Sequence, residues 1–122
     1  MKKSMNIAEL LLPPDVLDHF EVVSIEETKS LKQVDIYLDE LYQPPSSEYT
    51  YLSKGFTEER IMQDFPVRGK SVYLHVRRRK WLEKETGKIV TSIIELTHDG
   101  TQLTHEFAVF LKRIGSNPHQ YQ

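Results

Sequence analysis

The sequence predicts an α+β fold, with an antiparallel meander sheet of about five strands, short N-terminal helices and one C-terminal amphipathic helix. Two observations support this. Apolar and polar residues alternate along several short segments in the middle of the chain, as they do in half-buried strands. Near both ends, apolar residues recur at helical spacing instead. Because 122 residues suffice for one hydrophobic core, we expect a single domain over residues 1–115 and a flexible tail over 116–122.

Two short helices are expected before the sheet. Apolar residues from Ile7 to Leu11 fit one face of a helix that Asn6 can cap, and Pro13 ends this helix. Pro14 suits the first turn of a second short helix over residues 15–20.

Alternation and turn residues define the sheet. A short link at 28–30 predicts a hairpin between the first two strands, and the prolines at 44 and 45 make residues 42–53 a loop. Turns are expected at 65–70 and 85–88. The strands are expected at 20–27, 32–39, 55–65, 72–81 and 89–96.

A final helix is expected near the C-terminus. Asp99 or Thr101 caps it and Gly115 ends it. Its apolar stripe consists of Leu103, Phe107, Phe110, Leu111 and Ile114.

Charge is divided unevenly along the chain. The segment up to Arg60 has six Lys/Arg and twelve Asp/Glu, whereas residues 67–88 have eight Lys/Arg and only two Asp/Glu. Such an asymmetry favours one surface that attracts a polyanion. A solvated edge strand, whose charges prevent aggregation, is the alternative reading of the same cations.

The basic segment also contains aromatic side chains, which can stack on bases. On a strand, Arg77 and Arg79 should point to one face, and Arg78 and Lys80 to the other. Arginine suits bidentate contact with phosphate or guanine. The candidate nucleic-acid contacts are Arg68, Lys70, Tyr73, His75, Arg77, Arg78, Arg79 and Lys80.

The residues do not predict an enzyme. The chain has no cysteine, its five histidines are scattered, and its glycines are isolated, so we expect no metal, cofactor or catalytic site. No stretch approaches the length of a membrane span, and the apolar start is too short for a signal peptide. We therefore expect a cytoplasmic protein.

Several segments together carry a family resemblance. The chain resembles the N-terminal region of bacterial insertion-sequence transposases, in which a small DNA-binding region precedes a DDE-type catalytic domain. The resemblance covers most of residues 10–114. The segments that carry it are 10–13, 20–23, 53–56, 61–70, 72–81, 86–90 and 103–111.

The resemblance implies recognition of the ends of a mobile element. Many relatives bind zinc through cysteines after the basic strand, and this cysteine-free chain departs from that pattern. In place of a zinc finger we expect a tight hairpin at 85–88 with Trp81 packed over Ile89 or Val90, although Trp81 could instead stack on DNA. The chain lacks a catalytic domain, so we expect DNA recognition without cleavage.

The leading hypothesis is thus a non-catalytic module that binds double-stranded DNA during transposition. Two alternatives stay open: a module that docks a separately encoded DDE transposase subunit, and an RNA-binding domain. Acidic and basic regions in one chain also suit weak self-association.

Overall fold

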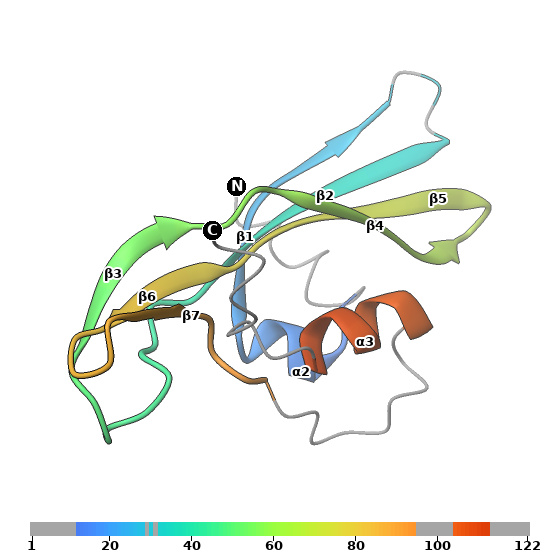
Figure 1. Ribbon diagram of the computed structural model, residues 1–122. Helices are drawn as coiled ribbons and strands as arrows, with labels where there is room; N and C mark the ends of the chain where they lie inside the picture. The colour runs from blue at the N-terminus through green and yellow to red at the C-terminus, as the bar shows by residue number, and fades with distance from the viewer. Residues whose placement is uncertain (1–11, 29, 31, 95–103, 113–122) are drawn as a thin grey trace.

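The protein is an α+β fold dominated by two β-sheets, shown in Figure 1. This computed structural model describes residues 12–28, 30, 32–94 and 104–112. The predicted helix over 7–11 and the tail over 116–122 lie outside the described residues. The elements are α2 (Pro14–Leu17), β1 (Phe20–Glu27), β2 (Gln33–Glu40), β3 (Tyr51–Phe56), β4 (Arg60–Val67), β5 (Lys70–Arg77), β6 (Arg79–Glu83), β7 (Lys88–Val90) and α3 (His105–Lys112).

The strands form two sheets, where the sequence predicted one meander. The four-stranded sheet has the order β1-β2-β5-β4, and the three-stranded sheet has the order β3-β6-β7. Neighbouring strands are antiparallel except β2 and β5, which run parallel. The prediction of a purely antiparallel sheet was therefore wrong at its centre. The chain leaves β2, crosses to the second sheet in β3, and returns through β4 before β5 joins β2.

One long bent ribbon connects the two sheets. β4 pairs with β5, and β3 pairs with β6, so residues 51–67 run antiparallel to residues 70–83. The ribbon bends where Thr57 meets Arg78: the Thr57 amide donates to the Arg78 carbonyl at 2.7 Å, and the Arg78 amide donates to Thr57 Oγ1 at 3.1 Å. The predicted strands 55–65 and 72–81 are each divided at this bend.

The first two strands follow their sequence pattern closely. β1 has the predicted bounds, and β2 is displaced by one residue. They form the predicted antiparallel hairpin, with a bulge where Val23 interrupts the register between Val22 and Ser24. The expected strand at 89–96 is shorter, because β7 ends at Val90.

Two hairpin turns place residues in the left-handed backbone region. Arg68 (φ 52°) and Gly69 (φ 77°) form a two-residue connection between β4 and β5, which requires positive φ at both positions. Gly87 (φ 75°) ends the longer turn between β6 and β7. Both turns were predicted, and both set the register of the strands beside them.

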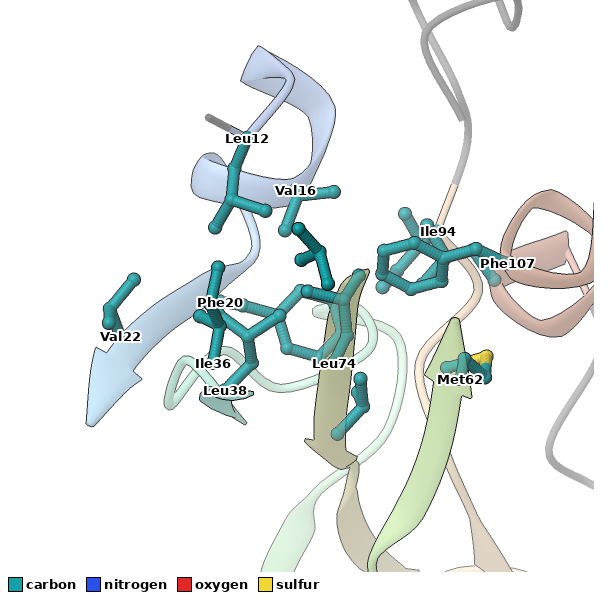
Figure 2. Close-up of a cluster of buried hydrophobic side chains, with 13 residues drawn as sticks. Leu12, Val16, Phe20, Val22, Ile36, Leu38, Met62, Leu74, Ile94 and Phe107 are labelled. Carbon is teal, nitrogen blue, oxygen red and sulfur yellow. The ribbon is translucent and has the colours of Figure 1, made fainter. Parts of the chain in front are cut away.

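The main core lies between the four-stranded sheet and the two helices. In Figure 1, α2 and α3 lie on the same side of this sheet. Figure 2 shows Val16, Phe107 and Ile94 gathered over Phe20, Leu38 and Leu74. This packing follows from the alternation in β5, because the predicted apolar face of Val72, Leu74 and Val76 is fully buried.

The C-terminal helix is present, and its start differs from the prediction. Thr104 is the cap, since its Oγ1 accepts from the Phe107 amide at 3.3 Å and its carbonyl accepts from the Ala108 amide at 3.0 Å. Phe107 and Leu111 of the predicted stripe are buried, and Phe110 is partly buried. Asp99, Thr101, Leu103, Ile114 and Gly115 lie outside the described residues.

Candidate nucleic-acid interface

The cations of β5 lie beside the carboxylates of β2. Parallel pairing places Asp35 next to Tyr73, Tyr37 next to His75, and Asp39 next to Arg77. Arg77 donates to both carboxylate oxygens of Asp39, at 2.8 Å from Nε and 2.6 Å from Nη2. The Arg77 side chain is 43% exposed, but a phosphate would have to displace Asp39 to use the Nε and Nη2 donors that already bind this carboxylate.

Arg78 faces the opposite way and is buried at the bend of the ribbon. Its side chain is 5% exposed, and its Nε lies 3.0 Å from Glu40 Oε1, on a carboxylate that is 7% exposed. The same Glu40 oxygen accepts from the Arg79 amide at 2.8 Å. This ion pair leaves the Arg78 guanidinium no access to a DNA backbone, so Arg78 stabilises the bend and is not a surface contact.

Arg79 is held against aromatic rings. Its guanidinium lies 5.0 Å from the ring of Tyr42 and 4.6 Å from the ring of Phe56, and its Nε donates to the Glu40 carbonyl at 3.0 Å. Arg77 lies over the same Phe56 ring at 4.3 Å. Phe56 therefore contacts two of the arginines that the sequence assigned to DNA.

His75 bridges two carboxylates on the outer face of the four-stranded sheet. Its Nε2 is 2.7 Å from Asp35, its Nδ1 is 3.2 Å from Glu59, and its ring stacks on Tyr37 with centroids 4.1 Å apart. Burial lowers the pKa of His75, but the hydrogen bonds and charges of Asp35 and Glu59 outweigh that effect and raise the pKa above its usual value. The ring is occupied and is not presented for stacking.

The remaining predicted contacts of the four-stranded sheet are spread along it. Lys70 forms an ion pair with Glu27, and Tyr73 is half-buried beside Asp35. Arg68 is exposed at the β4–β5 turn, and within the described residues it has no carboxylate partner. Of the eight predicted residues, Arg68, Arg79 and Lys80 thus have a cationic side chain with no carboxylate partner within the described chain, and Arg79 is held instead by two aromatic rings and the Glu40 carbonyl.

Lys80 has a neighbour that sequence reasoning missed. Ser53 is opposite Trp81 and Phe56 is opposite Arg79, with a bulge between them, so Lys54 and Gly55 together lie opposite Lys80. No acidic side chain of the described residues lies within ion-pair distance of either lysine. Like charges in such a position repel each other, so their juxtaposition favours a site that an anion would stabilise.

A row of aliphatic residues lies beside these lysines on the same face of the three-stranded sheet. Leu52 is opposite Leu82, and Leu82 is opposite Ile89, so the row crosses all three strands. Leu52 is 45% exposed, and the other two are partly exposed. The strands and turn of this sheet carry five Lys/Arg and two Asp/Glu over residues 51–56 and 79–90, a net charge of +3.

Trp81 is the centre of the opposite face. It is 1% exposed, and Tyr42 and Tyr51 contact its ring edge-on at centroid distances of 5.0 and 6.5 Å. Its cross-strand neighbour is Val90, whereas Ile89 lies on the other face. Trp81 therefore packs in the core of the hairpin as expected, and its neighbour there is Val90. The Trp81 indole is not exposed for stacking on DNA.

Two further features bear on the function. Among the described residues, no cluster of three or more His, Asp or Glu side chains is arranged to hold a metal ion. In the same part of the chain, no helix combines the length and apolar character needed to cross a membrane. Comparisons with known protein families, characterised proteins and solved structures give no match to this chain.

Proposed function

We propose that the chain is a non-catalytic DNA-binding module of the kind that precedes the catalytic domain in insertion-sequence transposases, and that it binds duplex DNA through the three-stranded sheet. The observation that carries this proposal is the adjacent, unpaired pair of Lys54 and Lys80. The resemblance of residues 10–114 to that family supports the same role.

Electrostatics favour this sheet over the basic strand β5. A cation already paired with a carboxylate must lose that partner before it can neutralise a phosphate, so its net gain on binding is small. Lys54 and Lys80 have no such partner to lose, and a phosphate between them would also relieve their mutual repulsion. The aliphatic row beside them offers contact area for the sugar groups of the backbone.

The test is a salt series that compares two double variants of equal charge. Fluorescence anisotropy of a labelled duplex is measured between about 50 and 200 mM salt, the range over which phosphate contacts lose most of their affinity. In Lys54→Glu/Lys80→Glu, we expect weaker binding and a slope of log K against log salt that is smaller by about 2, because two phosphate contacts are lost.

The matched control is Lys32→Glu/Arg68→Glu, which changes the same total charge at two exposed positions outside the three-stranded sheet. It should retain the wild-type slope. Equal losses of DNA affinity in both double variants would show that only the net charge of the protein matters. If the wild-type protein does not bind DNA even at low salt, autonomous DNA binding is rejected. Competition with single-stranded RNA separates the duplex-DNA proposal from RNA binding.

The aliphatic row favours a second candidate function on the same face. The contiguous residues Leu52, Leu82 and Ile89 would suit docking of a separately encoded catalytic subunit, because exposed apolar patches mark protein contacts. Leu82→Ser separates the two functions. It should abolish a protein complex while leaving the salt slope for DNA unchanged.

A further inference from the structure

The two sheets have four edge strands, and three of them have features that discourage pairing with another chain. β1 has a bulge at Val23 and several glutamates, and β3 has a bulge with Lys54 and Gly55. β7 is only 3 residues long. Bulges, charges and short length all protect sheet edges from unwanted pairing.

β4 is the least protected of the four. Its register with β5 is regular from Arg60 to Asp64 and shifts only between Asp64 and Val67, beside Pro66. β4 is 8 residues long, and among the strands of the described residues it pairs only with β5. Its outer face presents Ile61, Gln63 and Phe65, with no charge among them, and Ile61 and Phe65 are 54% and 48% exposed. Pro66 cannot donate a ladder hydrogen bond, so regular pairing is confined to the strand before it.

We propose that β4 pairs antiparallel with β4 of a second copy of this chain, about a two-fold axis at Gln63. In that register Ile61 of each copy lies opposite Phe65 of the other, and the two Gln63 side chains lie opposite each other. The four-stranded sheets of the two copies then join into one continuous sheet. This inference does not depend on the proposed DNA-binding function.

The arrangement of residues on β4 favours a second copy over an unrelated partner. A two-fold contact requires a surface that is complementary to itself. Ile61 and Phe65 lie at equal distances on either side of Gln63, and an aliphatic residue paired with an aromatic one is a favourable cross-strand combination. The amide of Gln63 carries both a donor and an acceptor, so it can bond to its own copy.

A charge exchange tests this register. Ile61→Lys or Phe65→Glu alone places a charge opposite an apolar side chain of the other copy. Each single variant should therefore weaken dimerisation by about tenfold or more, the size of effect expected when a central interface residue is changed. The double variant Ile61→Lys/Phe65→Glu should recover dimerisation, because each lysine then meets a glutamate of the other copy. Within one chain these positions are about 13 Å apart along the strand, too far to pair with each other. Sedimentation equilibrium measures the association, and circular dichroism confirms the fold.

A cross-link provides the second measurement. The chain has no cysteine, so Gln63→Cys introduces a single thiol. Directly opposed residues in an antiparallel pair have Cα atoms about 4.5–5.5 Å apart, within the range for a disulfide. Oxidised Gln63→Cys should form a covalent dimer, whereas Ser24→Cys, at an exposed position on the edge strand β1, should remain monomeric.

The outcomes are decisive in both directions. A wild-type dimer, loss in both single variants and recovery in the double variant would establish the β4 contact. A chain that stays monomeric at about 1 mM, where even a Kd of 1 mM leaves much of it paired, would overturn the proposal. A dimer indifferent to all these changes would also overturn it, since the contact would then lie elsewhere.

Discussion

The two sheets of this protein hold their cations in opposite ways. In the four-stranded sheet, Lys70, His75 and Arg77 of β5 each contact a carboxylate, and Arg78 does so at the bend just after β5. In the three-stranded sheet, the lysines at 54 and 80 have no carboxylate partner in the described chain. The difference arises because β5 runs beside the acidic strand β2, whereas β6 lies between β3 and β7. A run of charge in a sequence therefore becomes a charged surface only where the neighbouring strand leaves it unpaired.

The sheets also differ in what stabilises them. The four-stranded sheet shares a large core with α2 and α3. The buried apolar side chains of the three-stranded sheet are Trp81 and Val90, and neither belongs to that core cluster. We therefore expect the two sheets to respond differently to the loss of one large side chain.

The largest effect is expected from truncation of Trp81. Trp81→Ala should reduce the free energy of unfolding by about 4 kcal/mol, because a buried ring is lost and a cavity remains. Hydrogen exchange should accelerate mainly in β3, β6 and β7. Leu74→Ala, in the main core, should cost about 3 kcal/mol and accelerate exchange throughout the molecule. Equal acceleration in both sheets for Trp81→Ala would mean that the sheets unfold as one unit.

A slightly smaller effect is expected at the bend of the ribbon. Arg78→Met should cost about 3 kcal/mol in urea denaturation, because it leaves the Glu40 carboxylate buried without its partner. Lys80→Met, two positions along the same basic run, should change stability by about 0.5 kcal/mol or less, since its charge is unpaired.

The double variant Arg78→Met/Glu40→Leu is the control for this interpretation. Replacing both charges by apolar side chains should recover most of the loss. If the double variant is as unstable as the sum of its two single variants, the pair contributes through its backbone hydrogen bonds and not through its charge.

The smallest effect is expected from pH. The pKa of His75 is raised in the folded protein, so its contribution to stability is fully present below the unfolded value of about 6.5 and is lost as pH rises through the folded value. Between mildly acidic and mildly alkaline pH, we expect a loss of about 1 kcal/mol, of the order of one hydrogen bond. His75→Gln should flatten this dependence. A pH profile that persists in His75→Gln would assign it to other groups.

Local pattern was sufficient for much of the fold. Alternation located β1 and β2, and the spacing of Phe107 and Leu111 located α3. The partners of strands were not predictable in this way. The parallel contact between β2 and β5 depends on the route of the chain through β3 and β4, which no short segment encodes.

The candidate site was predicted only in part for the same reason. Lys80 was named, but Lys54 was not, because 26 positions of sequence separate two residues that a ladder brings together. The burial of Arg78, in contrast, could have been predicted from the alternation of residues in the sequence. Arg78 continues the buried face of Val72, Leu74 and Val76, and Glu40 continues that of Ile36 and Leu38. Two opposite charges at the ends of two apolar faces indicate a buried pair.

The bent ribbon has a consequence for the order of folding. Its two arms meet at a two-residue turn, so its contacts can form from nearby residues and grow outward. The contact of β2 with β5 joins residues 38 positions apart and must wait for a longer loop to close. We therefore expect the arginines of the ribbon to acquire their carboxylate partners late. Until then, a growing or refolding chain would expose three consecutive arginines that can bind an anion, whereas in the mature protein Arg77 and Arg78 are held by carboxylates.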